Sequence, residues 1–414
     1  MNKEFFKKNR QSVMDKTINN SIVVVFAGEA PVKSADEAYP FTPNRNFYYL
    51  TGINKENIIL LMVKNNNKVE EFLYVEKSDP VLEKWVGKKL NSDEAKEISG
   101  VENIGYIDDF NAKLQFLLNR FNFDNLYLDL ERRQWTDGLS NTQVFAKATI
   151  EKYPYLKVLN IYGIISEMRT IKTKEEVEII KEAIEVTKQG IYSMMKNSKP
   201  GMMEYELEAY FDFELKRRGI TDYAFKTIAA SGINGTVLHY SQNNSKIGDN
   251  DLILFDLGAQ YKYYASDISR TIPITGKFTE RQKQIYNIVL KAQLEVLKII
   301  KPGLPYKELN LTTRKVFAEE LKKIGLIKED SEVSKYYFHG VSHHLGLDTH
   351  DVGVYGDDLL LKPGMVFTVE PGLYIEEEAI GIRIEDDVLV TEDGYENLSK
   401  DILKTVEDIE YYMS

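Results

Sequence analysis

Two acidic residues stand in consecutive stretches that otherwise read as apolar strands. Asp256 lies in the first stretch and Asp267 in the second. A carboxylate buried in such a run must be paired with a cation or bind a metal ion. A turn at Tyr261 and Lys262 would set the two carboxylates opposite each other on one face, about 5 Å apart. Two carboxylates at that separation repel unless a cation lies between them.

The same arrangement is predicted once more near the carboxyl end of the chain. Glu370 and Glu385 each stand beside an apolar run, and a turn at Glu377 and Glu378 would set them opposite each other. Arg383 should share their face, because side chains alternate along a strand. Four carboxylates, two from each region, are therefore expected to converge on one site.

The histidines gather around the same regions. The sequence has 5 histidines, and four of them lie in one stretch punctuated by glycine. A single histidine is more often structural than functional, but such a cluster favours a site. The four are His339, His343, His344 and His350, and the fifth is His239.

Four carboxylates and one imidazole form an oxygen-rich set of ligands. Since the chain has no cysteine to supply a thiolate, such a set favours Mn(II), Fe(II), Co(II) or Zn(II) over copper. Four carboxylates exceed the needs of one catalytic ion and suit two ions about 3.5–4 Å apart. Two such ions can hold a bridging hydroxide and polarise a carbonyl, which is hydrolytic chemistry.

Two halves with the same order of elements are expected to carry these residues. Each half reads as a helix, a Lys-Pro-Gly turn, a second helix, a glycine stop and then strands. This predicts a duplicated unit with a site between its halves. The matched segments are Lys199-Pro200-Gly201 with Lys301-Pro302-Gly303, and Glu214-Leu215-Lys216 before Gly219 with Glu320-Leu321-Lys322 before Gly325.

A separate α/β domain is expected ahead of the duplicated unit. Short β-branched or aromatic runs predict strands, and apolar residues at helical spacing predict helices. Thr173 and Glu176 form a capping-box pattern that should begin the next domain. The domains are therefore placed at residues 1–165 and 166–414. The predicted strands are 22–26, 47–51, 58–63, 72–75 and 126–130, and the predicted helices are 110–121 and 142–153.

Composition excludes several classes of protein. The absence of cysteine rules out disulfides, thiolate metal sites and cysteine nucleophiles. A net charge of -11 disfavours a nucleic-acid partner, which would require a basic face. No apolar run approaches the roughly 20 residues of a membrane span, and charges interrupt the N-terminal stretch, unlike a signal peptide. We therefore expect a cytoplasmic protein without a nucleic-acid or membrane partner.

At these residues the sequence resembles the pita-bread metallopeptidases, and among them the Xaa-Pro aminopeptidases (aminopeptidase P). The resemblance covers nearly the whole chain. It implies an α+β fold, in which a creatinase/prolidase-like domain with a mixed sheet precedes a pita-bread catalytic domain. In that domain two helix pairs should back a curved antiparallel sheet. The motifs are Asp256-Leu257-Gly258, Ser266-Asp267-Ile268-Ser269-Arg270-Thr271, His339-Gly340, Ser342-His343, Leu345-Gly346, Glu370-Pro371-Gly372 and Arg383-Ile384-Glu385-Asp386.

The resemblance also implies a set of metal ligands. They should hold two divalent ions, which in this family are usually Mn(II), although Co, Fe or Zn also suit them. Asp267 and Glu385 would bridge the two ions, and Glu370 would take the proton of the bridging water. The implied ligands are Asp256, Asp267, His343, Glu370 and Glu385.

Further residues should contact the substrate. By resemblance, His350 would hydrogen-bond it and stabilise the tetrahedral intermediate. His239, His339 and Arg383 would line the pocket for the residue after the scissile bond. A second interpretation of Arg383 is a salt bridge that orients Glu385 or another acid. His344 is expected to be structural.

The implied substrates are peptides with proline in second position, cut before that proline. A homodimer or a higher homo-oligomer is also implied. Asn46 stands where many relatives carry an acid, which removes an acidic anchor for the substrate amine. Trp85 either packs within its own domain or, as in some relatives, reaches the site of a neighbouring subunit.

Several alternatives remain. Prolidase, the Xaa-Pro dipeptidase, shares the metals and the layout but bounds the far end of its substrate differently. Creatinase-like relatives and metal-free peptide or histone chaperones lack the ligands, all of which are present here. Methionine aminopeptidases usually lack a front domain of this size. Cleavage of peptides longer than two residues separates an aminopeptidase from a prolidase.

Overall fold

The computed structural model describes residues 1–132, 134–353, 356 and 358–414, and the chain divides into two compact units, Met1–Ser166 and Glu167–Ser414. The first unit is built on a six-stranded sheet in the order β6-β5-β4-β1-β7-β8. Its β1–β4 and β4–β5 pairs are antiparallel, and its other pairs are parallel. The strands are β1 Ser21–Phe26, β4 Ile59–Asn65, β5 Lys68–Val75, β6 Asn103–Tyr106, β7 Asn125–Leu128 and β8 Lys157–Asn160.

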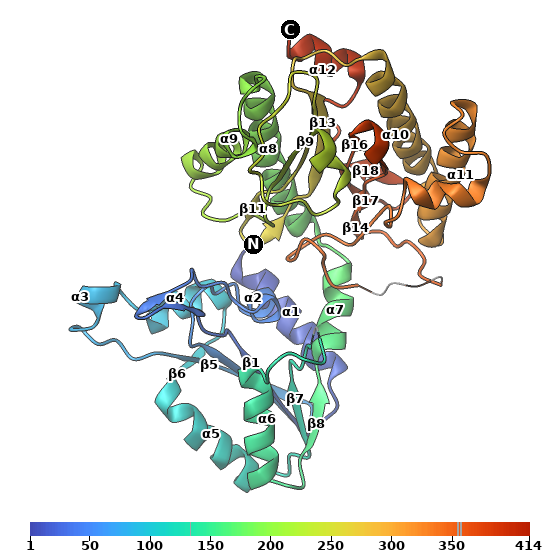
Figure 1. Cartoon of the computed structure of the whole chain (residues 1–414). Coiled ribbons are helices and arrows are strands. Elements are labelled where there is room, and N and C mark those ends of the chain that lie inside the picture. Colours follow the sequence, from blue (N-terminus) through green and yellow to red (C-terminus); the bar gives the residue numbers. More distant parts are fainter. Residues whose placement is uncertain (133, 354–355, 357) are drawn as a thin grey trace. The chain divides into compact units, whose positions relative to one another are not determined.

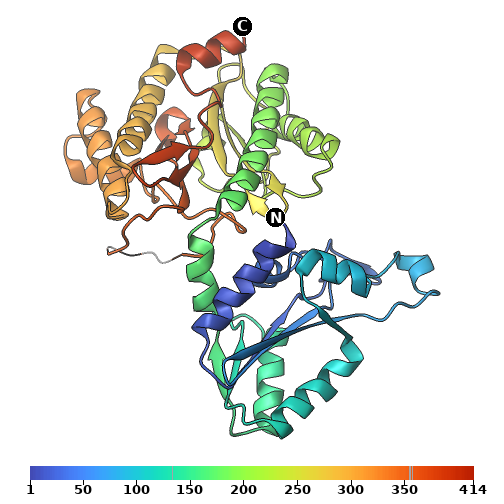
Figure 2. The same cartoon turned by 180° about the vertical axis from the view of Figure 1, so that it is seen from behind.

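Helices cover both faces of this sheet (Figures 1 and 2). Helices α5 and α6 pack their apolar residues on one face, in a core that includes Leu114, Ala146 and Leu61. Both helices confirm the expectation from apolar spacing. The helices of this unit are α1 Lys3–Lys16, α2 Arg45–Thr51, α3 Glu83–Val86, α4 Ser92–Ser99, α5 Ile107–Arg120 and α6 Asn141–Lys152, and a small hairpin joins β2 Val32–Ser34 to β3 Glu37–Ala38. Helix α7 Tyr162–Thr170 runs across the division between the units.

The strand predicted at residues 47–51 is wrong, because this segment is helix α2. The Asn44 side chain accepts a hydrogen bond from the backbone N–H of Phe47 and begins the helix, and Gly52 in the left-handed conformation ends it. The segment is buried throughout. Its sequence therefore has no regular alternation of polar and apolar residues that could distinguish a helix from a strand. The other four predicted strands are confirmed.

The second unit contains two helix pairs, which lie on either side of its strands in Figure 1. The first pair is α8 Lys174–Asn197 and α9 Glu204–Arg217, and the second is α10 Glu280–Ile299 and α11 Lys307–Lys323. Gly201 and Gly303 have φ of 85° and 81° in the turns that join each pair. The predicted duplication and the capping box at Thr173 are confirmed.

The strands of the second unit form short antiparallel ladders. One ladder has the order β13-β10-β9, another has the order β14-β17-β18, and two further pairs are β11-β12 and β15-β16. The remaining elements are 3₁₀ turns and a final helix. The bounds are β9 Ile228–Ser231, η1 Gly232–Thr236, β10 Leu252–Leu257, β11 Gln260–Tyr261, β12 Tyr264–Ala265, β13 Ile268–Pro273, η2 Asp330–Lys335, β14 Val366–Val369, β15 Gly372–Ile375, η3 Glu376–Glu378, β16 Ile380–Arg383, β17 Asp386–Val390, β18 Tyr395–Asn397 and α12 Val406–Tyr412.

The predicted register of the first hairpin is wrong by two residues. Asp256 pairs with Ser269 rather than with Asp267. The turn centres on Lys262 and Tyr263, which have φ of 48° and 67°, the left-handed conformation of a tight type I′ turn. A shift of two residues keeps the same face, so Asp267 remains a diagonal neighbour of Asp256.

The predicted register of the second hairpin is confirmed. The ladder pairs Gly372 with Arg383 on one side of the carboxylates, and Val369 with Asp386 on the other. Glu370 and Glu385 therefore stand opposite each other where the ladder is interrupted. Pro371 has no N–H to donate, which is a physical reason for the interruption.

Among the helices of the described residues, none combines the length and the apolarity needed to cross a membrane.

Candidate active site

Predicted metal ligands from both halves of the second unit converge. Asp267, His343 and Glu385 each offer a ligand atom, and these atoms all lie within 4.8 Å of one another. The Nε2 atom of His343 is 3.3 Å from Asp267 Oδ2 and 3.5 Å from Glu370 Oε1. Asp267 precedes β13, Glu370 follows β14, and Glu385 lies between β16 and β17. The interrupted ladders thus bring these side chains into one cluster.

Asp256 is the fourth carboxylate of the set, and its two oxygens have different environments. Its Oδ2 accepts a hydrogen bond of 2.5 Å from Arg383 Nη2, while its buried Oδ1 has no hydrogen-bond partner among the described residues. A buried carboxylate oxygen without a partner is costly. A metal ion at this position would satisfy it, so the residues present fit a metal site.

The electrostatics of the cluster also fit bound cations. Burial and the charges of Glu385 and Asp256 raise the pKa of Asp267 well above its usual range. Burial and the charges of Glu370 and Asp256 do the same to the pKa of Glu385. Burial raises the pKa of Glu370 as well, against the opposing charges of His343 and Arg383. Like charges this close are ionised together only when cations balance them.

Hydrogen bonds orient His343 toward the carboxylates. Its Nδ1 lies 3.1 Å from the carbonyl oxygen of His344 and donates to it, which leaves Nε2 with its lone pair facing the acids. Its backbone N–H donates to Thr368 Oγ1, and that hydroxyl donates to Glu370 Oε1 at 3.2 Å. Thr368 was not predicted, although its place two residues before Glu370 puts it on the same strand face.

Arg383 is buried and links the two halves. Its Nε donates to Ser269 Oγ at 2.8 Å, and that hydroxyl donates to Glu385 Oε2 at 2.7 Å. With the bond to Asp256, these contacts form the ion pair of the second interpretation, and the role of Arg383 in lining a pocket stays a prediction. Its Nη1 also donates to the hydroxyl of Tyr374 at 3.0 Å. Neither Ser269 nor Tyr374 was singled out in the sequence as a site residue.

His339 lies at the end of this network. Its Nε2 is 2.9 Å from the Tyr374 hydroxyl, and its Nδ1 is 2.7 Å from the carbonyl oxygen of Gly340. Burial, assisted by the charges of Arg383 and His239, lowers the pKa of His339 to about 4. The imidazole is therefore neutral near pH 7, accepting from Tyr374 and donating to Gly340.

His350 and His239 complete the group. The ring centroids of His350 and His343 are 4.3 Å apart. Burial, then the charges of His343 and His239, lower the pKa of His350. Leu238 and Tyr240, on either side of His239, pack against the cluster that contains Tyr374, so all nine candidate residues lie in one part of the second unit.

A buried ion-pair cluster that was not predicted supports the loop with His350. Asp351 accepts from Arg169 at 2.6 Å and from Lys172 at 3.0 Å. All three side chains are almost fully buried. Nothing in the sequence pattern distinguishes Asp351 from a surface acid, so the sequence carried no signal for this cluster.

The remaining predictions concern His344, Asn46 and Trp85. His344 is buried and stacks on Tyr306 with ring centroids 5.9 Å apart, in agreement with a structural role. In the first unit, Asn46 is buried and donates to Asp129 Oδ2 at 2.9 Å. Trp85 is 85% exposed, so the interpretation in which it packs within its own domain is wrong.

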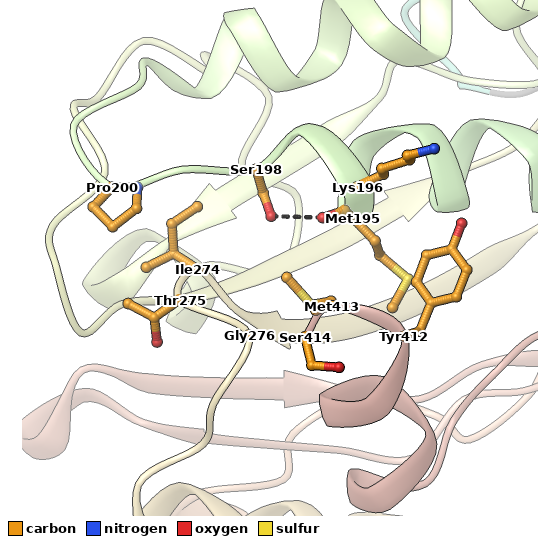
Figure 3. Close-up of a pocket in the computed structure, with 10 residues that line it drawn as sticks. All are labelled: Met195, Lys196, Ser198, Pro200, Ile274, Thr275, Gly276, Tyr412, Met413 and Ser414. Atoms are coloured by element: carbon orange, nitrogen blue, oxygen red, sulfur yellow. Dashed lines mark hydrogen bonds between the residues drawn. The ribbon is translucent and has the colours of Figure 1, made fainter.

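A separate cavity of about 470 Å³ lies beside the end of α8 and the final helix α12 (Figure 3). Its lining is mixed, and the Ser198 hydroxyl there donates to the carbonyl oxygen of Met195 at 2.9 Å. None of the nine candidate residues lines it. The residues around it are Met195, Lys196, Ser198, Pro200, Ile274, Thr275, Gly276, Tyr412, Met413 and Ser414.

Two family models match the chain. "Metallopeptidase family M24" matches residues 178–392, and "Aminopeptidase P, N-terminal domain" matches residues 6–127. The Xaa-Pro aminopeptidase of Escherichia coli (strain K12) is 35% identical over 100% of this chain and 98% of its own length. The Xaa-Pro aminopeptidase of Haemophilus influenzae is 34% identical over 100% and 97%.

Solved structures agree along the full length. A candidate aminopeptidase P from Bacillus anthracis has a TM-score of 0.98 and 56% identity, covering 100% of this chain and 98% of that one. Escherichia coli aminopeptidase P, as a variant in complex with substrate and as a zinc-substituted form in complex with product, has a TM-score of 0.92 and 34% identity, with 100% and 98% coverage.

These likenesses extend over both units, and they support the pita-bread fold and an aminopeptidase over a prolidase. The cluster of carboxylates and histidine lies within the part that the M24 model matches. The chain therefore belongs to metallopeptidase family M24, in its group of Xaa-Pro aminopeptidases.

Proposed function

We propose that the chain releases the first residue of peptides with proline in second position, using two divalent metal ions. The observation that carries this proposal is the convergence of the four carboxylates with His343. The raised pKa values of Asp267, Glu370 and Glu385 express a deficit of positive charge that two cations would meet. The structures of Escherichia coli aminopeptidase P in complex with substrate and with product support a peptide substrate for this chain.

The metal-binding side chains have distinct proposed positions. Asp267 and Glu385 would each hold the ions, because burial and neighbouring acids raise the pKa of both carboxyl groups and a cation would relieve this. Bound ions would activate a water molecule and polarise the scissile carbonyl. Mn(II) is the proposed metal because oxygen ligands dominate the set, and Co, Fe or Zn also fit it. The proposed ligands are Asp256, Asp267, His343, Glu370 and Glu385.

Glu370 is the proposed proton acceptor. Its raised pKa brings it nearer to neutral pH, where a carboxylate can take a proton from water and return it to the leaving amine. The Thr368 hydroxyl that donates to Oε1 at 3.2 Å would hold the carboxylate in place. His350 is proposed to donate a hydrogen bond to the substrate, since its lowered pKa keeps the ring neutral near pH 7.

The pocket for proline is proposed to be formed by His239, His339 and Arg383. The amide before proline carries no N–H, so recognition must come from the shape of the pocket and from bonds to the carbonyl. The hydrogen bonds from Tyr374 and Arg383 hold His339 and the guanidinium in fixed positions. Fixed polar groups cost little reorganisation when substrate binds.

Three further assignments stay predictions. The domain boundary at 165/166 is supported by the division into compact units. A homodimer or higher homo-oligomer is supported by the exposed apolar side chains Val81, Trp85 and Val86 around α3. A cytoplasmic location is the third.

One experiment tests the proposed function. Protein loaded with Mn(II) is given Arg-Pro-Pro and Gly-Pro, with EDTA as a control, and bound metal is counted by mass spectrometry. We expect two ions per chain and cleavage of the tripeptide that EDTA abolishes. Cleavage of Gly-Pro alone would favour a prolidase, and one ion per chain at full activity would contradict the dinuclear site.

A further inference from the structure

His239 lies in a segment with little secondary structure of its own. Residues 232–251 join β9 to β10, and in the part with His239, residues 232–245, the regular structure is the short 3₁₀ turn η1. His239 itself is exposed. A histidine that must meet a substrate at a defined place therefore needs an anchor from outside the segment.

Glu204, the first residue of α9, supplies such an anchor. Its Oε1 accepts from the backbone N–H and the hydroxyl of Ser231, at 2.8 and 2.7 Å, and from Asn234 Nδ2 at 3.0 Å. Its Oε2 accepts from the Tyr240 hydroxyl at 2.7 Å and from the backbone N–H of Ser245 at 2.9 Å. One carboxylate thus holds both ends of the segment and the residue next to His239.

These bonds are distinct from the capping of α9. The backbone N–H of Met203 before the helix is bonded by Glu206 Oε2 at 2.7 Å, so the capping carboxylate is Glu206. Every side-chain bond found for Glu204 comes from residues 231–245. Glu204 is also 0% exposed, whereas Glu206 is exposed.

The segment is held from its other side by β16. A Cβ atom placed on Gly381 would lie 1.8 Å from the carbonyl oxygen of Gly235. Backbone therefore packs on backbone there, with no room for a side chain. The segment with His239 is fixed between Glu204 of the first half and β16 of the second.

We infer that Glu204 is a positioning residue for the substrate pocket, because its buried carboxylate fixes residues 231–245 and with them His239. The inference rests on the pocket role proposed above for His239. A positioning role makes one prediction that a purely structural role does not. Replacing Glu204 should lower turnover only while the imidazole of His239 is present.

Replacing Glu204 by glutamine isolates this effect. The amide keeps the shape but has one accepting oxygen, and its NH₂ must face donors on either side. Turned one way it opposes the N–H of Ser245, and turned the other way it opposes the N–H of Ser231. A backbone N–H can donate a hydrogen bond but cannot accept one, so in either orientation one buried N–H loses its partner.

The test compares kcat and KM for Arg-Pro-Pro in Mn(II)-loaded protein carrying E204Q, H239A or both. A displacement of about 1 Å can cost up to about a hundredfold in rate, and we expect E204Q to lower kcat/KM by at least about tenfold. The double variant should match H239A alone. Glu206→Gln, the same change two residues along α9, is the control and should leave kcat/KM unchanged.

Tyr240→Phe covers the case in which E204Q fails to fold. It removes one hydrogen bond to Glu204, which corresponds to about fivefold in kcat/KM, and its effect should also vanish with H239A. Unchanged kinetics in E204Q and Y240F, or losses that multiply with that of H239A, would overturn the inference. If H239A itself keeps full activity, the proposed pocket role fails instead.

Discussion

Glu385 and Asp386 are consecutive in the chain and both are buried, yet their carboxyl groups have opposite pKa shifts. Burial and nearby acids raise the pKa of Glu385 well above its usual range. Asp386 is equally buried, but the charges of Arg270 and Lys404 lower its pKa to about 2. Arg270 donates to it at 2.7 Å, and Lys404 and Asn397 donate as well.

The difference separates two uses of a buried carboxylate. On the Asp386 side, the chain supplies cations that neutralise the acid, so the group stabilises the fold. On the Glu385 side, Arg383 is engaged with Asp256, and the acids Glu370 and Asp256 lie near. The acids on this face can all be ionised only when cations from solution balance them, as the proposed metal ions would.

Glu385→Gln should have the largest effect, and only on activity. Loss of a ligand should lower kcat/KM by at least about a thousandfold, since metal stabilisation of the transition state amounts to several kcal/mol. The metal-free fold should change by less than about 1 kcal/mol, because the substitution relieves repulsion and Ser269 can still donate to the amide. Kinetics with Mn(II) and urea unfolding with EDTA measure the two effects. Retained activity would contradict the ligand role.

Asp386→Asn should have the converse effect. Removing one partner of a buried ion pair costs about 3 kcal/mol or more, because Arg270 and Lys404 lose their counter-charge. The free energy of unfolding without metal is the measurement. Asp393→Asn, an exposed aspartate near the end of β17, is the matched control and should change it by less than about 0.5 kcal/mol. An equal loss of unfolding free energy in Asp386→Asn and Asp393→Asn would contradict a stabilising role of the Asp386 ion pairs.

Mn(II) should stabilise the two variants differently. An ion that binds the folded state at about 100 times its Kd adds about 2.7 kcal/mol per site. Thermal unfolding with and without Mn(II) should show this gain in wild type and in Asp386→Asn, and a much smaller gain in Glu385→Gln. A full gain in Glu385→Gln would place the bound ion elsewhere.

The smallest expected effect is on pH dependence. The pKa of Asp386 is lowered to about 2 in the folded state, so its contribution to stability is present above the usual aspartate pKa of about 4 and is lost as pH falls toward 2. The shift corresponds to about 2 kcal/mol. The difference in unfolding free energy between wild type and Asp386→Asn, measured from pH 7 downward, should shrink below pH 4. A difference independent of pH would refute this account.

Side-chain types and turn spacing were sufficient to predict the second hairpin. The acidic loop at Glu377 and Glu378 is centred on the predicted position, so the carboxylates of Glu370 and Glu385 fell in register. The first hairpin turns on Lys262 and Tyr263, two residues that seldom adopt positive φ. The position of this turn therefore depends on how the surrounding chain packs, which the conformational preferences of these two residues do not reveal.

Buried polar residues were harder to predict than the acids and histidine of the candidate cluster. Glu204 and Asp351 look like ordinary surface acids, because apolar periodicity carries no signal for a carboxylate that is buried and fully paired. Arg383 was predicted to line a pocket or to pair with an acid, but the sequence could not identify Asp256 as its partner, because the ion pair joins strands from opposite halves. Helix α2 was mistaken for a strand because a short, wholly buried aromatic run has no distinguishing period.

The contact between Gly235 and Gly381 has a consequence for cooperativity. Because backbone packs on backbone there, the first half cannot open without exposing β16 of the second. We therefore expect amide protons of β9 and β16 to exchange with solvent at one common opening free energy. The duplicated halves, although built from the same succession of elements, should melt as a single unit.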